Sequence, residues 1–411
     1  MSQHLAILGA GPVGIEAALY ARSLGNRVTL YERGPVAAAN VADWGHVHLF
    51  TPWKMNVTTL GVETLRRHGR WPEFPADICP SGDELRRHYL VPLTECEPLL
   101  HCLRVQTTVV RIGREDHHKS DAIGQPQRAE GGFRILVEDA AGHQRVDHAD
   151  IVLDCSGTYG HHRWAGRGGI PAPGESGLED QIRYTLPDPI ERDRLTFLDK
   201  HTLLLGCGYS AATFIKNIEF LNRSHPATRL TWAIRRPGQA IQTINEDPLP
   251  ARRHLVQAAI TLAQEPPAWL TFLPNLALES IEHAQGGFTA HFARLDDSPR
   301  TNPRPAIHCD NIVAMVGYAP DTSLYDQLQV HSCYATAGPM KLAAALLGES
   351  SADCLTAGAN LSSDTLKNPE PNFYILGAKS YGTNSNFLLQ VGHNQIRDVF
   401  KLIHPNAPVL V

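Results

Sequence analysis

The chain has 411 residues, 43% of them hydrophobic, and a formal net charge of −5, which together suit two or three domains and argue against nucleic acid as a partner. No apolar run reaches the roughly 18 residues of a membrane span. The first expected strand begins by Leu5, which leaves no room for an export leader, and the eight cysteines are scattered. We therefore expect a cytoplasmic protein without a membrane partner.

A glycine-rich nucleotide fingerprint opens the chain. A strand is expected over 5–8 and a helix over 12–23, and Gly9-Ala10-Gly11-Pro12-Val13-Gly14 joins them. Gly9 permits a tight turn, Gly11 admits a pyrophosphate, and Gly14 lets helix and strand pack closely. A strand over 28–31 then leads to Glu32, a carboxylate suited to ribose hydroxyls. The predicted dinucleotide contacts are Gly9, Gly11, Pro12, Val13, Gly14, Glu32 and Arg33; a glycine turn without a ligand is the alternative.

The next stretch predicts the rest of a first domain. A helix over 85–93 is expected with Ser81 as its cap, followed by a strand over 103–111 that contains Val109. Strands at 133–137 and 144–147 predict a hairpin. The polar segment 115–132, which lies between the strand over 103–111 and this hairpin, is expected to be a solvent-exposed loop. An apolar run over 149–157 ends in Ser156-Gly157.

A second fingerprint follows the expected strand over 202–205. It is Gly206-Cys207-Gly208-Tyr209-Ser210-Ala211, followed by a helix to about Leu221 and a strand over 230–234. Arg235 and Arg236 stand where the first unit has its acid. Guanidinium groups pair with a 2′-phosphate, so NADPH is favoured over NADH, although a solvated strand end is the plainer interpretation. The predicted contacts are Gly206, Gly208, Tyr209, Ser210, Ala211, Arg235 and Arg236. Segment 245–253 is expected to be a loop, with Arg252 and Arg253 either on phosphate or on the surface.

Strands at 278–281, 288–292 and 310–318 repeat the order seen after the first fingerprint, so a whole domain is duplicated. The predicted fold is α/β with two Rossmann-like (three-layer ββα) dinucleotide-binding domains. With these motifs the chain resembles the two-dinucleotide-binding-domain flavoproteins, which include disulfide reductases, thioredoxin-reductase-like enzymes and flavin-containing monooxygenases. The resemblance implies FAD at the first motif and NADPH at the second. It also implies an NADPH domain, 166–325, inserted into an FAD domain split into 1–165 and 326–411.

The resemblance also implies flavin contacts outside the glycine loops. Asp154-Cys155-Ser156-Gly157 resembles the second FAD signature, in which Ala-Thr-Gly is usual, and 372–378 resembles the closing FAD strand. The acid that often follows Gly377 in the family is missing at Ala378-Lys379. Segment 44–56 would run under the flavin ring, with Asn56 and Lys54 as candidate catalytic residues and Trp44 and Trp53 as walls or core anchors. Further implied contacts are Val109, Ser156, Gly157, Gly377 and Asn386. Either Asn386 or Ser385 would cap a helix over 387–402.

The reaction to expect depends on which branch of the superfamily the chain resembles. No two cysteines have the CxxC or CxxxxC spacing of a thiol relay. The form Gly-x-Gly-x-Ser-Ala resembles the flavin-containing (class B) monooxygenases, although their FxGxxxHxxxW signature is absent. The resemblance implies an NADPH-dependent FAD monooxygenase that uses dioxygen, through a C4a-(hydro)peroxyflavin, to oxygenate a small nucleophilic substrate.

Two other functions remain open: a reductase or dehydrogenase with a non-oxygen acceptor, and a non-catalytic redox sensor. The histidines lack Cys or acid at ligand spacing, so no metal site is expected. The substrate, homo-oligomer formation and any chemical role of His46, His48, Gln390 or His393 are not decided by the sequence.

Overall fold

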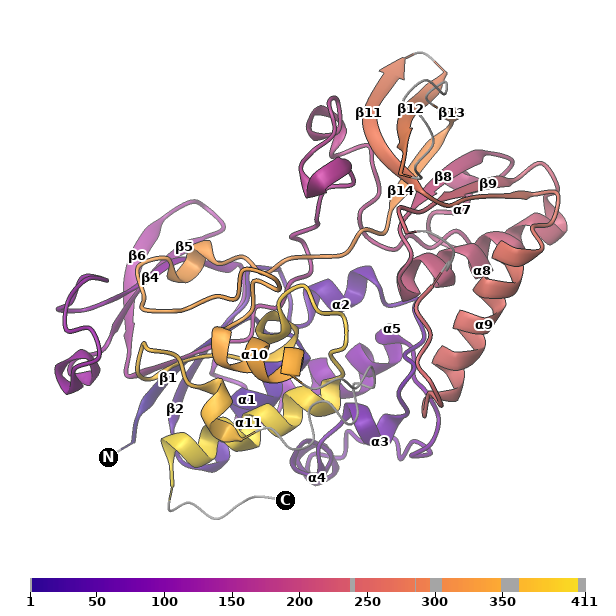
Figure 1. Cartoon of the computed structure of the whole chain (residues 1–411). Coiled ribbons are helices and arrows are strands. Elements are labelled where there is room, and N and C mark those ends of the chain that lie inside the picture. Colours follow the sequence, from indigo (N-terminus) through magenta and orange to yellow (C-terminus); the bar gives the residue numbers. More distant parts are fainter. Residues whose placement is uncertain (1, 237–240, 285, 296–304, 349–361, 406–411) are drawn as a thin grey trace. The chain divides into compact units, whose positions relative to one another are not determined.

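The computed structural model describes residues 2–236, 241–284, 286–295, 305–348 and 362–405. The chain divides into two compact units (Figure 1). The first unit combines 1–161 with 319–411, and the second unit, 162–318, is inserted between those segments. The sequence places the same two boundaries a few residues later, at 165/166 and 325/326.

The first unit is built on a five-stranded parallel sheet in the order β15-β7-β1-β2-β3. Its strands are β1 (His4–Leu8), β2 (Arg27–Tyr31), β3 (Leu103–Arg104), β7 (Ile151–Asp154) and β15 (Phe373–Ile375). Because all pairs are parallel, the five strands end at one edge, where open α/β sheets bind ligands. Helix α1 (Pro12–Ser23) joins β1 to β2 and packs on α11 (Leu389–Ile403) (Figure 1). In this contact the ring centroids of Tyr20 and Phe400 lie 5.0 Å apart.

The strand expected over 103–111 is two strands in two sheets. Gln106 has φ +48 and breaks the extended chain after β3. Strand β4 (Thr107–Arg114) then starts an antiparallel sheet with β5 (Phe133–Asp139) and β6 (Gln144–Ala149). The hairpin of β5 and β6 confirms the predicted one.

Shorter helices complete the first unit: α2 (Ala39–Asp43), α3 (Trp53–Asn56), α4 (Thr59–Arg67), α5 (Gly82–Leu85), the π-helical turn η1 (Arg86–Leu90), α6 (Val91–Thr94) and α10 (Met340–Gly348). Ser81 and Glu84 form a complete capping box at the start of α5, which confirms the predicted cap. Short 3-10 turns lie at η2 (Pro126–Ala129), η5 (Ser323–Tyr325), η6 (Ser363–Leu366) and η7 (Gly377–Tyr381). Within the described residues, no helix combines the length and apolarity that a membrane crossing requires.

The second unit repeats the plan with a four-stranded parallel sheet, β10-β9-β8-β14, and an antiparallel sheet, β11-β12-β13. The strands are β8 (His201–Leu205), β9 (Arg229–Ala233), β10 (Leu270–Leu273), β11 (Leu276–Ala284), β12 (Gly287–Arg294), β13 (Ala306–Cys309) and β14 (Asn311–Ala314). The helices are α7 (Arg194–Phe197), α8 (Tyr209–Ser224) and α9 (Pro250–Gln264), with 3-10 turns η3 (Arg167–Gly169) and η4 (Ser176–Leu178). The duplication of a Rossmann-like domain is therefore confirmed.

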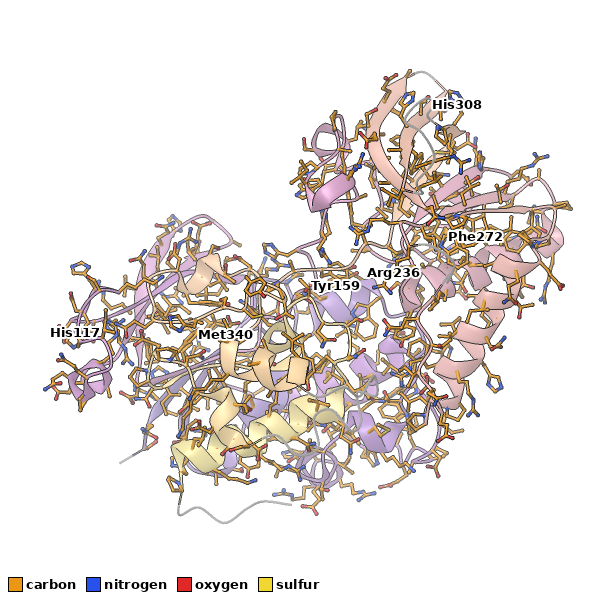
Figure 2. All side chains as sticks on the ribbon, in the orientation of Figure 1. His117, Tyr159, Arg236, Phe272, His308 and Met340 are labelled. Atoms are coloured by element: carbon orange, nitrogen blue, oxygen red, sulfur yellow. The ribbon has the colours of Figure 1, made fainter. Side chains whose placement is uncertain are left out.

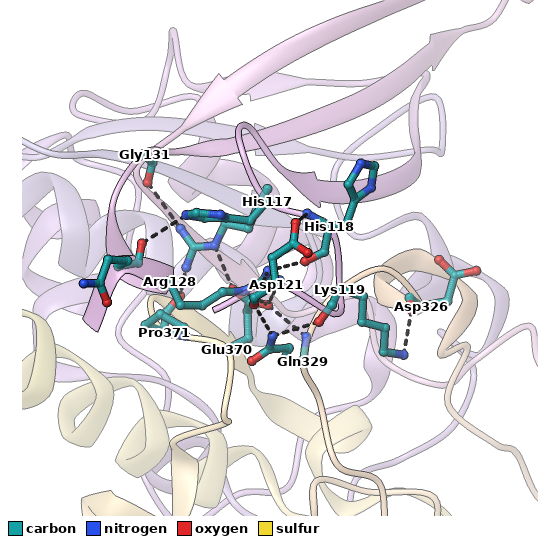
Figure 3. A network of polar contacts seen from close by, with 12 residues as sticks. His117, His118, Lys119, Asp121, Arg128, Gly131, Asp326, Gln329, Glu370 and Pro371 are labelled. Atoms are coloured by element: carbon teal, nitrogen blue, oxygen red, sulfur yellow. Dashed lines mark hydrogen bonds and ion pairs between the residues drawn. The ribbon is translucent and has the colours of Figure 1, made fainter. Parts of the chain in front are cut away.

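The sequence predicts a solvent-exposed loop over 115–132, but part of this segment is buried. Arg128 is 1% exposed. Its guanidinium binds the carboxylate of Glu370 (Figure 3), and Arg114 binds the same carboxylate. Burial opposes the charge of Glu370, but Arg128, the backbone N–H of Gln329 and Arg114 hold its pKa below the usual range. A buried charge is stable only when it is paired, so this cluster fastens the loop to the segment before β15.

Candidate functional site

A cavity of about 390 Å³ lies at the edge of the first unit's parallel sheet where β1, β2 and β7 end. It brings together eleven of the predicted contacts, which come from six separate stretches of the chain. They are Gly9, Gly11, Pro12, Val13, Glu32, Arg33, Trp44, Val109, Ser156, Gly157 and Gly377. The first fingerprint, the end of β2, the strand β4 and the three segments implied by the family resemblance therefore meet around one space.

The glycines of the first fingerprint differ in what surrounds them. Gly9 has φ +90, and a Cβ there would lie 2.9 Å from the carbonyl oxygen of Cys155. A Cβ at Gly14 would lie 1.9 Å from the carbonyl oxygen of Gly9, so Gly14 serves the close packing of helix on strand. Gly11 lines the cavity, yet a Cβ there would meet no protein atom within 4 Å. The bare backbone at Gly11 therefore leaves room for a ligand, not for another part of the chain.

The start of α1 is suited to an anion. Gly11 is the N-cap and supplies no side-chain hydrogen bond, and Pro12 occupies the first turn. The unpaired N–H groups of a helix start and its dipole favour negative charge. The loop can therefore hold a diphosphate group.

Glu32 holds the glycine loop in shape. Its Oε2 accepts a hydrogen bond from the N–H of Ala10 (3.0 Å), and its Oε1 accepts one from the N–H of Gly34 (2.8 Å). The carboxylate therefore ties the fingerprint to the turn after β2 while it lines the cavity. Its contact with ribose hydroxyls stays a prediction, and the free lone pairs of a carboxylate leave room for it.

The turn after β7 forms another wall. Cys155, Thr158 and Tyr159 line the cavity beside the predicted Ser156 and Gly157 (Figure 2 labels Tyr159). Burial, with Asp154 close by, raises the pKa of the Cys155 thiol well above its ordinary value. The thiol therefore stays protonated and is a poor nucleophile.

Sequence reasoning misses a histidine–aspartate contact on the cavity wall. His161 Nε2 lies 3.5 Å from Asp321 Oδ2, and both residues line the cavity. Burial opposes ionisation of Asp321, but hydrogen bonds from Ser323 and the nearby His161 hold its pKa below the usual range. Other unpredicted lining residues include Asn40, Thr107, Thr108, Leu324 and Phe387. Among these residues, only Thr107 and Thr108 could have been found from the sequence, because they lie next to the predicted contact Val109.

The two candidate catalytic residues do not line the cavity. Lys54 has a 58% exposed side chain and pairs with Asp77 at 2.5 Å. Asn56 is 1% exposed; its amide nitrogen donates to the carbonyl oxygens of Thr51 and Pro52, and its oxygen accepts from the Thr51 hydroxyl. Asn56 therefore closes the turn 51–56 by its hydrogen bonds, and Lys54 lies at the surface.

Of the two tryptophans in segment 44–56, only Trp44 lines the cavity. Trp53 is buried and stacks on Phe74 with ring centroids 4.4 Å apart, with Trp71 edge-on at 5.8 Å. Trp53 is therefore a core anchor, and its expected place as a wall is wrong.

The predicted cap of the last helix is also wrong. Helix α11 begins at Leu389 with Leu388 as its N-cap, so Asn386 lies in the preceding turn, where its N–H donates to Asn384 Oδ1. Gln390 is exposed, and neither it nor His393 lines the cavity. Burial lowers the pKa of His393 to about 4, so this side chain is neutral at pH 7.

The second fingerprint has the same loop geometry. Gly206 has φ +120, and a Cβ there would lie 2.2 Å from the carbonyl oxygen of Met315, whereas a Cβ at Gly208 would meet nothing within 4 Å. Gly208 is the N-cap of α8, whose first residues are the predicted Tyr209, Ser210 and Ala211. A helix start without a side-chain cap is again presented to solvent or a ligand.

The arginines after β9 differ in their exposure. Arg235 and Arg236 are exposed just beyond the strand, where a 2′-phosphate is expected (Figure 2 labels Arg236). Arg252 instead lies in α9, which begins at Pro250 and shortens the predicted loop. It is 2% exposed and pairs with Asp247 at 2.7 Å, so it has a structural role in place of the phosphate contact considered from the sequence.

Comparison with known proteins supports this arrangement. The family model for pyridine nucleotide-disulphide oxidoreductases matches residues 4–43, the first β-α-β unit. None of the curated proteins matches the sequence. Among solved structures, the chain is similar to a bacillithiol disulfide reductase from Bacillus cereus, with 15% identity and a TM-score of 0.68 over 99% of this chain and 100% of the other.

The structures of a monooxygenase and of an N-hydroxylase are also similar. One is the FAD-bound cadaverine monooxygenase of desferrioxamine biosynthesis from Erwinia amylovora, with 14% identity and a TM-score of 0.67 over 100% of this chain and 96% of the other. The other is an ornithine N-hydroxylase from Kutzneria sp. 744, solved with reduced FAD, NADP⁺ and L-ornithine, with 13% identity and a TM-score of 0.64 over 98% and 99%. Identities this low establish a shared fold, not a shared reaction.

Proposed function

We propose that this chain, which has the fold of the two-dinucleotide-binding-domain flavoproteins, is an NADPH-dependent FAD oxidoreductase. The observation that carries the proposal is the cavity at Gly11, where a missing Cβ leaves room for a ligand beside an uncapped helix start. The same loop geometry recurs at Gly208, next to two exposed arginines. Bound together, FAD and NADPH would supply the redox chemistry, a two-electron hydride transfer.

The residues of the chain have distinct tasks in this proposal. The N–H groups at the start of α1 bind the FAD diphosphate, and Glu32 holds the glycine loop and accepts from ribose hydroxyls. In the second unit, the start of α8 binds the NADPH diphosphate, and Arg235 and Arg236 pair with its 2′-phosphate.

For the overall reaction we propose a monooxygenase acting on a small nucleophile such as an amine or a sulfur compound. The balance is NADPH, H⁺, O₂ and substrate converted to NADP⁺, water and the oxygenated substrate. A thiol relay has little support, because no two cysteines have relay spacing and the one thiol on the cavity wall is buried with a raised pKa. The Gly-x-Gly-x-Ser-Ala form of the second fingerprint favours the monooxygenase branch.

A reductase with a non-oxygen acceptor is the second candidate, because the family model at residues 4–43 is that of pyridine nucleotide-disulphide oxidoreductases and the fold is shared with a disulfide reductase. Turnover with NADPH across a panel of amines, thioethers and ketones separates the two. For the monooxygenase we expect one substrate that lowers the hydrogen peroxide yield and gains one atom of ¹⁸O from ¹⁸O₂. Steady NADPH oxidation with an added acceptor under anaerobic conditions, without any oxygenated product in air, would support the reductase and contradict the monooxygenase.

A further inference from the structure

The chain has Ala378 and Lys379 after Gly377, where the family often has an acid, and Lys379 is buried. Lys379 is 1% exposed, in η7, and its Nζ lies 2.7 Å from Oδ2 of Asp154, whose side chain is also fully buried. The same Nζ donates a hydrogen bond to Ser156 Oγ at 3.0 Å and lies 5.1 Å from the centre of the Tyr325 ring. Asp154 is the last residue of β7 and is in register with Leu8 and Ile375. The ion pair therefore lies at the ligand-binding edge of the sheet.

Asp154 and Lys379 together determine which further hydrogen bond the Ser156 hydroxyl can make. The Ser156 hydroxyl donates to Asp154 Oδ1 at 2.6 Å and accepts from Lys379. A serine hydroxyl has one hydrogen and two acceptor positions, so only one acceptor position is left. Ser156 lines the cavity, whereas Asp154 and Lys379 do not. Of the three side chains, Ser156 is the one available to a ligand.

We propose that Lys379 is a positioning residue of the FAD site, which fixes Ser156 so that its hydroxyl meets the bound dinucleotide as a hydrogen-bond acceptor. The ligand group opposite Ser156 is then a donor, a hydroxyl or an N–H, and not a phosphate oxygen. This inference rests on the proposed FAD binding. Without the lysine, the hydroxyl could rotate and would lose the charge that strengthens its orientation.

Stability and affinity separate this role from a merely structural ion pair. Lys379→Met leaves the Asp154 carboxylate buried and unpaired, so it should destabilise the protein. Lys379→Met combined with Asp154→Asn removes both charges and should restore most of the thermal stability. In this double variant Ser156 has still lost its lysine partner, so FAD affinity should stay about tenfold below wild type.

The FAD dissociation constant is measured by titrating apoprotein with FAD, and thermal unfolding of the same apoprotein is followed in parallel. Ser156→Ala should lower FAD affinity by the same factor as the double variant, and adding Ser156→Ala to the double variant should cost nothing further, because both remove one interaction. Lys401→Met, which removes an exposed lysine paired with Asp398, is the matched control and should bind FAD like wild type.

The outcomes keep the two proposals apart. Wild-type protein that binds no FAD would overturn the proposed function, and this inference with it. If wild type binds FAD but the double variant regains full affinity together with its stability, Lys379 is only structural. Losses that add when Ser156→Ala is combined with the double variant would likewise overturn the positioning role.

Discussion

At the residue scale, the two fingerprints use glycine for two separate physical reasons. The first glycine of each loop has a positive φ and no room for a Cβ, so it is required by the fold itself. The second glycine of each loop has open space around it, so it is not required by any contact within the protein. We attribute it to the proposed ligand, so substitution of Gly11 in the cavity lining tests that proposal directly.

Gly11→Val tests this reading. The valine meets no protein atom where its Cβ is placed, so the apoprotein should unfold at about the wild-type temperature, but the side chain should block the diphosphate and lower FAD affinity at least about 100-fold. Gly113→Val is the control, since a Cβ at Gly113 in β4 also meets nothing within 4 Å but lies outside the cavity lining. Equal FAD binding by both variants would contradict the assignment.

The two exposed arginines predict cofactor preference. Arg235→Glu together with Arg236→Glu should raise the KM for NADPH by about 100-fold or more and leave the KM for NADH nearly unchanged, because only NADPH carries the 2′-phosphate. Arg229→Glu, at the other end of β9, is the matched charge reversal and should affect neither. An equal rise for NADH and NADPH in the double variant would refute the phosphate contact.

Glu16 predicts a pH dependence of stability. It is 3% exposed in α1 and accepts hydrogen bonds from Thr58 and Tyr89; burial raises its pKa from 4.5 to about 7. Because the folded-state pKa is raised, its contribution is fully present below about pH 4.5 and is lost as pH rises through 7. The unfolding free energy should fall by on the order of 3 kcal/mol across this range.

The difference in unfolding free energy between wild type and Glu16→Gln separates the contribution of Glu16 from those of other titrating groups such as His393. We expect this difference, measured by denaturant unfolding between pH 5 and 8, to shrink or change sign as the pH rises. Glu63→Gln, on the exposed face of α4, is the matched control for the loss of a carboxylate. A pH-independent difference at Glu16 would show that its carboxyl does not titrate in this range.

At the element scale, the sequence predicts what periodicity and glycine spacing determine. The β-α-β units at both fingerprints, the hairpin of β5 and β6 and the capping box at Ser81 appear where the local pattern places them. The failures have long-range causes. Val105 and Gln106 continue an alternating pattern, but the positive φ of Gln106 sends β4 into a second sheet. In the sequence, Arg128 has the surroundings of an exposed loop residue. It is buried in the structure because it pairs with Glu370, which lies far along the chain.

The Glu370 cluster predicts a strong stability effect. Glu370→Gln leaves two buried arginines, Arg114 and Arg128, without their carboxylate and should lower the unfolding free energy by about 3–5 kcal/mol. It should also speed proteolytic cleavage within 115–132, because Arg128 no longer holds the loop. Glu130→Gln, exposed in the same loop, should change neither quantity. Wild-type stability in Glu370→Gln would mean that the cluster contributes little.

At the scale of the whole molecule, the sequence predicts the duplicated domain and eleven residues of the cavity lining because the fingerprints fix where strands end. Its two candidate catalytic residues, Asn56 and Lys54, do not line the cavity. Only the resemblance places them there, whereas in the structure Asn56 bonds within its own turn and Lys54 pairs with Asp77. Trp53 is taken by an aromatic cluster that forms only when Phe74 and Trp71 fold back on it. Such contacts depend on tertiary packing, which no local pattern encodes.

We propose that this one chain binds both FAD and NADPH and passes electrons between them. Anaerobic addition of NADPH to FAD-reconstituted protein, with the visible flavin absorption followed, tests this electron transfer directly. We expect one equivalent of NADPH to bleach the bound flavin, and NADH to do so much more slowly. A protein that stays colourless with added FAD, or whose bound FAD keeps its colour under NADPH, would rule out this function.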